Sequence, residues 1–449
     1  MSDAKPNADL LTAHGAEPLS GRFVTPGDGA ISLRALLLAA LAVGSSRISG
    51  MRASPDLLAS AAALRQMGVR IDMDGADWRV QGLGGLGLLA AAAPLAPGAG
   101  LALWLGLLAP YNMTTRFSPD PAAEFDTLPP ALLEALSALG ARVERAEDGG
   151  ISLVGASLPL PVRLSLEEAD ETSKTALLLA GLQVAGQSAI HERVASQDHS
   201  EKLLARLGAD IAVTPDAGDG EGVTITLTGL PDLSPQAISV PGDPSAAAFA
   251  IVAALIIKGS DLVVDNVLIN PLRTGLIDTL LEMGGDIQFI NQRETGGEHI
   301  ADLRVRSSWL KGITISARHG RALIDDIGPL AIAAAFAQGE TVINGLGGLS
   351  AAQNGRLQTL IAGLRANKVG VTLDGGSLRL GTDGKVAGGG RVDCAGDASL
   401  AMSFAVLGLA SRHRVTVTGA TALADSFPDF VASMSAAGGR FPPTKPSRN

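Results

Sequence analysis

Hydrophobic and polar positions along this chain form a pattern that recurs six times. In each copy an apolar helical segment is followed by a glycine, then a small residue and the start of a strand. The spacing is about 70 residues, too long for a solenoid repeat but suited to a small βα unit. The fifth copy has Asn367-Lys368 in place of the glycine. The copies are Leu64–Gly68–Ile71, Leu136–Gly140–Val143, Leu203–Gly208–Ile211, Leu280–Gly284–Ile287, Leu360–Val371 and Phe430–Gly438–Phe441.

A second helical segment also recurs, and it is apolar on nearly all sides. A helix without a polar face is either buried in a protein core or placed in a membrane. Each unit therefore pairs one buried helix with one amphipathic helix, separated by strands such as 302–307, which predicts an α/β fold built from units. The buried segments are expected at 35–43, 101–108, 175–184, 246–257, 329–336 and 400–409.

Composition narrows the classes of function. The 449 residues carry a formal net charge of -10, which argues against nucleic acid and anionic membrane surfaces as partners. The single cysteine, Cys394, excludes an intrachain disulfide and fits a reducing cytoplasm. Six scattered histidines predict no metal site. The apolar stretch 83–108 is interrupted by Pro94 and Pro97, so no membrane span is expected, and the polar N-terminus does not resemble a signal peptide.

A glycine-rich turn, Pro26-Gly27-Asp28-Gly29-Ala30-Ile31-Ser32-Leu33-Arg34, leads into the first buried helix. Such a turn presents backbone amides to an anion, although by itself it is more typical of a plain turn and N-cap. Together with the repeats and the segments at 198–202, 240–245, 270–275, 301–308, 401–404 and 426–428, it resembles the 5-enolpyruvylshikimate-3-phosphate (EPSP) synthase family over residues 18–440.

The resemblance implies a two-lobed inside-out α/β barrel of six βαβαββ units, three per lobe. Residues 22–238 would form one lobe, residues 1–21 with 239–440 the other, and residues 441–449 a disordered tail. The family transfers an enolpyruvyl group from phosphoenolpyruvate to shikimate 3-phosphate in the shikimate pathway, without a metal or an organic cofactor. The resemblance also implies that the protein is a cytoplasmic monomer and that it holds a small anionic ligand in the cleft between the lobes.

Three positions match the family's functional residues. By resemblance, Arg34 contacts shikimate 3-phosphate, Arg356 contacts phosphoenolpyruvate, and Asp325 is the catalytic acidic residue at the substrate hydroxyl. Ser32, in the glycine-rich motif, is also expected to bind substrate. Each of the three matches also has a purely structural interpretation. Arg34 can cover a helix start, Asp325 can cap a helix, and Arg356 can be a solvated helix residue.

At other positions the sequence departs from the family pattern. Most departures remove a cation or an amide that would hold a phosphate or carboxylate of a substrate. The acidic residues within 167–171 would in addition repel a polyanionic substrate. Lys174, Arg52 and Arg273 are the neighbouring cations that could compensate. The substituted positions are Gly29 and Ala30, the segment 98–107, Thr127, Asp170-Glu171-Thr172, Gln197, the segment 352–355 and Ser399.

Three functions follow from this combination. An intact scaffold with so many lost cations predicts a degenerate or repurposed member of the family, because each hydrogen bond to a charged group contributes about 1.5–3 kcal/mol. The first alternative is an active but divergent 3-phosphoshikimate 1-carboxyvinyltransferase. The second is an enzyme of another class that acts on a less charged ligand, with Asp325 as the base.

Overall fold

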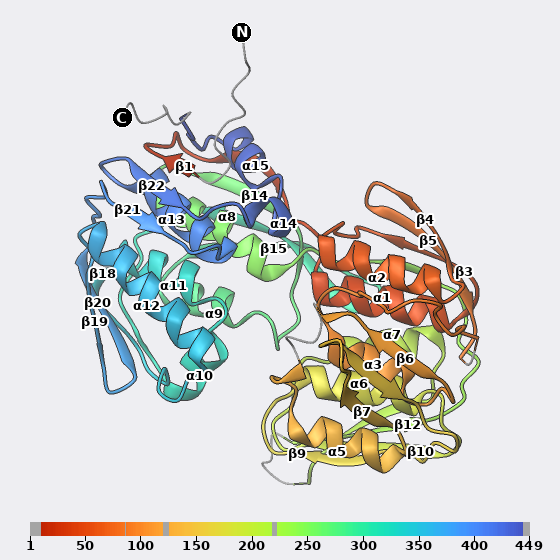
Figure 1. Ribbon diagram of the computed structural model, residues 1–449. Helices are drawn as coiled ribbons and strands as arrows, with labels where there is room; N and C mark the ends of the chain where they lie inside the picture. The colour runs from red at the N-terminus through yellow and green to blue at the C-terminus, as the bar shows by residue number, and fades with distance from the viewer. Residues whose placement is uncertain (1–9, 86, 120–124, 218–221, 443–449) are drawn as a thin grey trace. The chain divides into compact units, whose positions relative to one another are not determined.

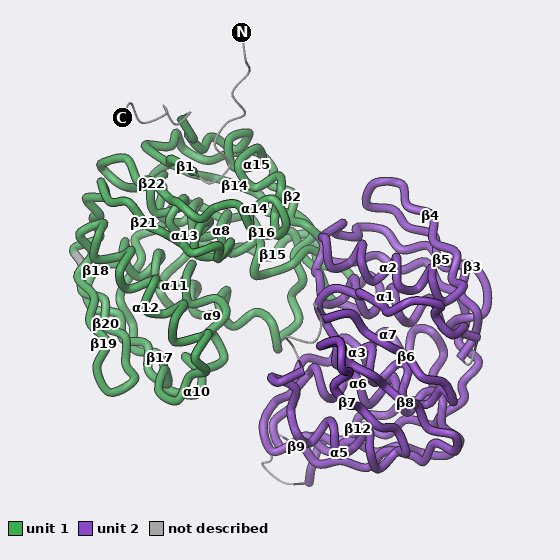
Figure 2. Tube along the Cα trace, in the orientation of Figure 1, with its two compact units in different colours: residues 1–26, 242–293, 299–449 green, residues 27–241, 294–298 purple. Residues whose placement is uncertain are grey.

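The computed structural model describes residues 10–85, 87–119, 125–217 and 222–442 (Figure 1). Its contacts divide the chain into two compact units (Figure 2). Unit 1 comprises residues 1–26, 242–293 and 299–449, and unit 2 comprises residues 27–241 and 294–298. The predicted lobe limits, 22 and 238, lie a few residues from these divisions, and the short segment 294–298 was not anticipated. Most of the predicted tail, 443–449, lies outside the described residues.

Among its described residues, unit 2 has three helices that are buried on nearly every side and three that bury only one face. The buried ones are α1 (Gly29–Leu41), α3 (Leu101–Leu108) and α6 (Glu171–Gly181), and α3 packs against α6. The half-buried ones are α2 (Pro55–Gln66), α5 (Pro130–Leu139) and α7 (His199–Leu207).

The sheets of unit 2 have the strand orders β13-β3-β5-β4, β6-β8-β7 and β11-β12-β10-β9. Their strands are β3 (Val43–Ser49), β4 (Arg70–Asp74), β5 (Asp77–Leu83), β6 (Thr114–Phe117), β7 (Arg142–Arg145), β8 (Ile151–Val154), β9 (Arg163–Leu166), β10 (Gln187–Glu192), β11 (Ile211–Pro215), β12 (Val223–Thr228) and β13 (Ala237–Ser239).

Unit 1 follows the same plan. Its buried helices α8 (Pro244–Ile256), α11 (Ile327–Ala335) and α13 (Ala398–Ala410) contact one another pairwise in the core. The remaining helices are α9 (Gly275–Glu282), α10 (Ala317–Ala322), α12 (Ala351–Ala366), α14 (Leu423–Ser426) and α15 (Phe430–Ala436).

The sheets of unit 1 have the strand orders β1-β22-β21, β15-β16-β14-β2 and β17-β18-β20-β19. Their strands are β1 (Leu10–Ala13), β2 (Ser20–Val24), β14 (Asp261–Leu268), β15 (Asp286–Thr295), β16 (Glu298–Arg306), β17 (Thr314–Ile315), β18 (Gln338–Ile343), β19 (Gly370–Asp374), β20 (Ser377–Asp383), β21 (Arg391–Asp393) and β22 (Val415–Thr418).

The recurring glycine has the backbone conformation that the pattern predicts. Gly68, Gly140, Gly208, Gly284 and Gly438 all have positive φ, between 90° and 119°. This left-handed conformation ends a helix at low cost when the residue is glycine. In the fifth copy Lys368 adopts it instead, with φ 66°. The sixth copy differs, because no strand follows Gly438 in the described residues up to 442.

The predicted α/β class and the burial of one helix in each of the six repeats are confirmed. In three of the four-stranded sheets, one strand pair is parallel and two pairs are antiparallel. However, the described strands form six separate sheets of three or four strands, and none of these sheets closes on itself. The prediction of barrels is therefore not confirmed at that level of detail. Among the described residues no helix has the length and apolar character to cross a bilayer.

Candidate active site

Helix α1 begins at the glycine-rich motif. Asp28 is its N-cap, and Asp28 Oδ1 accepts a hydrogen bond from the Ile31 amide at 2.9 Å. The Ser32 hydroxyl donates to the Asp28 carbonyl at 2.7 Å, and Ser32 is fully buried. These bonds stabilise the first turn of the helix. The hydroxyl proton of Ser32, predicted to face substrate, is thus engaged within α1.

Arg34 is surrounded by partners from its own unit. It is 4% exposed. Its Nε donates to Ser200 Oγ at 3.1 Å and its Nη1 to the Ala30 carbonyl at 2.8 Å. Its Nη2 donates to Thr175 Oγ1 at 3.3 Å and forms an ion pair with Glu171. A buried guanidinium requires such partners, because an unpaired buried charge is costly. The charge of Arg34 is therefore balanced inside unit 2.

The acidic segment before α6 has two separate structural roles. Asp170 is the N-cap of α6, and its Oδ1 accepts from the Ser173 amide at 2.9 Å. This confirms a helix cap, where a carboxylate also suits the helix dipole. Glu171 instead pairs with Arg34, whereas Glu168 is exposed. Sequence reasoning saw these acids as repelling a polyanion but missed the bond to Arg34.

Lys174, one of the cations that could compensate for the losses, is completely buried. Its Nζ lies 2.8 Å from Glu201 Oε1 and 3.1 Å from Glu192 Oε2, and donates to the Ser196 carbonyl at 3.3 Å. Burial raises the pKa of Glu201, although the Lys174 ammonium acts in the opposite direction. Lys174 is thus already committed to two carboxylates in the interior.

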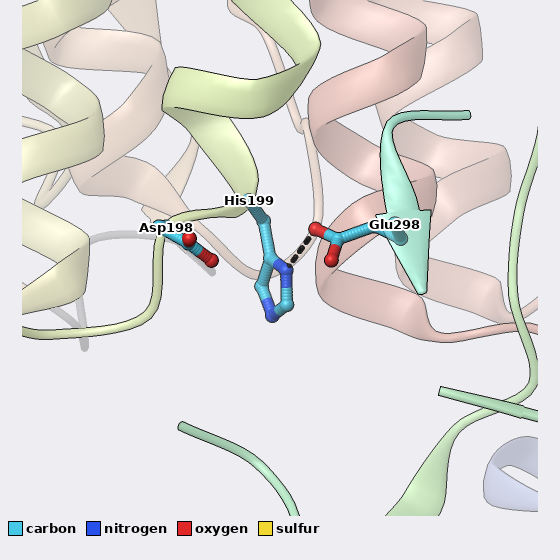
Figure 3. Close-up of side chains that lie close together, drawn as sticks. All are labelled: Asp198, His199 and Glu298. Carbon is cyan, nitrogen blue, oxygen red and sulfur yellow. Dashed lines mark hydrogen bonds and ion pairs between the residues drawn. The ribbon is translucent and has the colours of Figure 1, made fainter. Parts of the chain in front are cut away.

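Asp198, His199 and Glu298 bring three potential metal-ligand atoms within 4.8 Å of one another (Figure 3). His199 Nδ1 and Glu298 Oε1 are hydrogen-bonded at 2.6 Å. Lys202 Nζ lies 3.0 Å from Asp198 Oδ1 and 3.1 Å from Glu298 Oε2. Burial lowers the pKa of Lys202, but its bonds and ion pairs with both acids outweigh this and raise it. An ammonium group thus supplies the positive charge that these carboxylates need.

In unit 1, Asp325, which precedes α11, lies near Arg356 in the second turn of α12. Arg356 Nη1 is 3.9 Å from Asp325 Oδ1, and Arg356 Nε is 3.0 Å from Asp397 Oδ2. Asp397 also caps α13 by accepting from the Leu400 amide at 2.9 Å. The Asp325 side chain is 85% exposed and that of Arg356 is 24% exposed. The structure thus joins two predicted site residues and adds Asp397, which sequence reasoning missed.

Asp326, rather than Asp325, occupies the N-cap position of α11. Burial raises the pKa of Asp326, whereas a hydrogen bond with Ser245 and the positive charge of Arg273 act to lower it. Arg273, another of the possible compensating cations, is 3.2 Å from Asp243 Oδ1. The two neighbouring aspartates therefore have different environments, since Asp325 is solvent-exposed and Asp326 is partly buried.

Comparison with known proteins identifies the family. The family model for EPSP synthase (3-phosphoshikimate 1-carboxyvinyltransferase) matches residues 13–434. The chain belongs to the EPSP synthase family. Relatives named 3-phosphoshikimate 1-carboxyvinyltransferase include one from Methylorubrum populi, 41% identical over 96% of each chain, and one from Brucella canis, 42% identical over 96% of each chain. An EPSP synthase structure from Acinetobacter baumannii has a TM-score of 0.86 and 31% identity, covering 96% of this chain and 99% of that one.

The family prediction made from the motifs is therefore confirmed. Because these EPSP synthase relatives are named for the transferase activity, the comparisons favour the predicted active, divergent enzyme over the degenerate one. They do not test the individual site residues. Ser32 and Arg34 lie in unit 2, and Asp325 and Arg356 lie in unit 1. Their roles in this member of the EPSP synthase family remain predictions.

Proposed function

We propose that this protein is a divergent 3-phosphoshikimate 1-carboxyvinyltransferase of the shikimate pathway. It would join the enolpyruvyl group of phosphoenolpyruvate to the 5-hydroxyl of shikimate 3-phosphate and release inorganic phosphate. The observation that carries the proposal is the similarity over nearly the full length of both chains to proteins named for this reaction. In keeping with the family, we propose that it works as a cytoplasmic monomer.

The reaction needs a base for the attacking hydroxyl, a proton donor for the enol carbon and cations for two anionic substrates. Asp325 suits the first role, because its carboxylate is exposed and can reach a substrate hydroxyl. Arg356 suits the binding of the phosphoenolpyruvate carboxylate, because its side chain keeps partial access to solvent beside Asp325. Arg34 would bind shikimate 3-phosphate only if the phosphate competes with Glu171.

A second candidate function is a family protein that no longer performs the transfer. The observation that favours it is the pairing of surviving cations with acids, Arg34 with Glu171 and Arg356 with Asp397. A substrate anion must displace these carboxylates or share the guanidinium groups with them. If these carboxylates outcompete the substrate anions for the two arginines, the protein would instead bind a less charged ligand or a partner.

One assay separates the two candidates. The purified protein is mixed with shikimate 3-phosphate and phosphoenolpyruvate, and phosphate release is followed, with Asp325→Asn as the variant expected to lose at least about a hundredfold in rate. Turnover in the usual enzyme range of about 1–10³ s⁻¹ that depends on Asp325 supports the transferase. Absence of phosphate release from the folded wild-type protein at millimolar substrate would refute it and leave the second candidate.

A further inference from the structure

The outer face of one sheet of unit 2 contains a pocket. Side chains alternate between the two faces of a strand. In the sheet β11-β12-β10-β9, Ile190 of β10 and Ile225 of β12 are buried, and both strands contact α6, so these two side chains lie on the inner face. The residues on either side of them face outward, where a pocket of about 280 Å³ opens. The pocket is lined by Arg163, Leu164, Ser165, Ala189, His191 and Thr224.

The strand register explains why this face is hollow. Arg163 of β9 lies opposite Ala189 of β10, whose side chain is a single methyl group. In the next outward-facing row, His191 lies between Ser165 of β9 and Thr224 of β12. Neighbouring strands are about 4.8 Å apart, and residues on the same side of one strand are about 7 Å apart. The small Ala189 therefore leaves space beside Arg163 on one side and the polar row of His191 on the other.

The guanidinium of Arg163 is not neutralised by an acid. In the part of the chain that the structure describes, its side chain has no hydrogen bond or ion pair. Arg193, which follows β10, instead has its Nε 3.3 Å from Glu167 Oε2. A guanidinium can bind two oxygens of a carboxylate or phosphate at once. An oxyanion can therefore bind Arg163 without displacing a described carboxylate.

His191 presents a different kind of group to the pocket. Its Nε2 is 3.0 Å from Asp216 Oδ2, and Nδ1 has no hydrogen bond to any described residue. An ionised carboxylate only accepts, so Nε2 carries the proton, and Nδ1 of the neutral imidazole is an acceptor. The hydroxyls of Ser165 and Thr224 on either side can donate or accept. This side of the pocket therefore suits a ligand hydroxyl rather than a second oxyanion.

We propose that this pocket binds a small hydroxylated anion, with its carboxylate or phosphate on Arg163 and a hydroxyl that donates to His191 Nδ1. The pocket is smaller than the roughly 300–1,000 Å³ of sites for drug-sized ligands, so the ligand has only a few carbon atoms. The lining residues are not among those predicted to bind the substrates of the transferase. The inference therefore goes beyond the proposed function and does not depend on it.

Two-dimensional NMR of the protein with ¹³C-labelled histidine tests the site, and the His191 signal is assigned by its loss in His191→Gln. Glycerate and glycerol 3-phosphate supply the carboxylate and the phosphate forms of the ligand chemistry, whereas propionate lacks the hydroxyls. At least one of the two hydroxylated probes should shift the His191 signal saturably at millimolar concentration, and the stronger of them shows which anion the site prefers. Propionate should bind at least about fivefold more weakly, because it cannot donate to Nδ1.

Variants of the arginine test its role in the pocket. Arg163→Gln should weaken binding of the stronger probe at least about tenfold, because it removes charged hydrogen-bond donors. Arg163→Lys should retain an intermediate affinity, since it keeps the charge but not the planar fork. Arg163 is exposed, so both variants are expected to unfold at the wild-type temperature. Arg193→Gln, which removes the paired arginine after β10, is the matched control and should bind as the wild type does.

Three outcomes would overturn the inference. The first is no saturable shift of the His191 signal with either hydroxylated probe. The second is equal affinity in Arg163→Gln and in the wild type. The third is propionate binding as tightly as glycerate, which would remove the role of the hydroxyl. Shifts confined to the other histidines would place the anion elsewhere in the protein and count as the first outcome.

Discussion

Arg34 in unit 2 and Arg356 in unit 1 both occupy positions where the family resemblance predicts a substrate contact, yet their surroundings differ. Arg34 is enclosed by two hydroxyls, a carbonyl and the carboxylate of Glu171. Arg356 is partly exposed and has one close acid, Asp397, with Asp325 farther away. A cation that is retained in the sequence can bind an anionic ligand only if no neighbouring acid already pairs with it. Glu171 comes from another helix, 137 residues along the chain from Arg34.

Removing the buried cation should have the largest effect. Arg34→Met leaves the Glu171 carboxylate without its partner, and we expect the free energy of unfolding to fall by about 2–4 kcal/mol, since breaking a largely buried pair is costly. Urea unfolding measures this change. Adding Glu171→Gln should restore part of it. Arg193→Met, which breaks an exposed pair with Glu167, is the control and should change stability by less than about 1 kcal/mol. Equal losses in the two arginine variants would contradict the contrast in burial.

Removing the acid from the same pair should release the cation. Glu171→Ser leaves Arg34 with hydroxyl and carbonyl partners only, so a phosphate no longer competes with a carboxylate. We expect shikimate 3-phosphate to bind about ten- to a hundredfold more tightly, the equivalent of one charged hydrogen bond. Calorimetry gives the affinity, with the exposed neighbour Glu168→Gln as the control. Unchanged binding would show that Arg34 is purely structural.

The corresponding change in unit 1 should be smaller. Asp397→Asn keeps an N-cap on α13 while removing the charge beside Arg356. Because Arg356 is partly exposed, we expect phosphoenolpyruvate affinity to rise by only about fivefold or less, within the range for exposed ion pairs. Fluorescence or calorimetric titration measures it, and Asp393→Asn, an exposed aspartate nearby, is the control. A gain as large as that of Glu171→Ser would remove the distinction between the two arginines.

The pH dependence of stability tests the two aspartates beside Arg356. Burial raises the pKa of Asp326 in the folded protein above its unfolded value of about 3.9. The folded state therefore holds this proton more tightly, so the stability from this group is complete below about pH 4 and is lost as pH rises through the folded pKa. Relative to wild type, Asp326→Asn should become progressively more stable from about pH 4 to 7 in urea titrations. The exposed Asp325→Asn is the control, and a flat difference for Asp326→Asn would contradict its burial.

Local pattern was enough to predict much of the fold. Glycine after an apolar helix predicts a left-handed helix end, and the structure has it in five of the six copies, with Lys368 taking the same conformation in the remaining one. The all-apolar segments predicted the buried helices for a similar reason, since burial leaves no polar face. The sixth copy had the same local pattern, but no strand follows it as far as residue 442, where the described residues end. A strand also requires a partner that local sequence does not specify.

The candidate site was less predictable, because it depends on pairs between distant segments. The motif placed Ser32 and Arg34 correctly on α1, but nothing near them in the sequence indicates Glu171 or Thr175. Arg52 was predicted only as a cation that could compensate for the lost ones, and its position beside Gly29 requires the turns at 27 and 50 to meet.

The five residues 294–298 have a practical consequence for dissecting this protein. They form the tip of the β15–β16 hairpin, whose strands belong largely to the unit 1 sheet, but they group with unit 2. Glu298 there is buried and bonded to His199 and Lys202. The chain thus passes from one unit to the other at four points rather than two. A recombinant fragment limited to residues 27–241 would leave His199 without its carboxylate, so the unit is not a module that can be excised by two cuts.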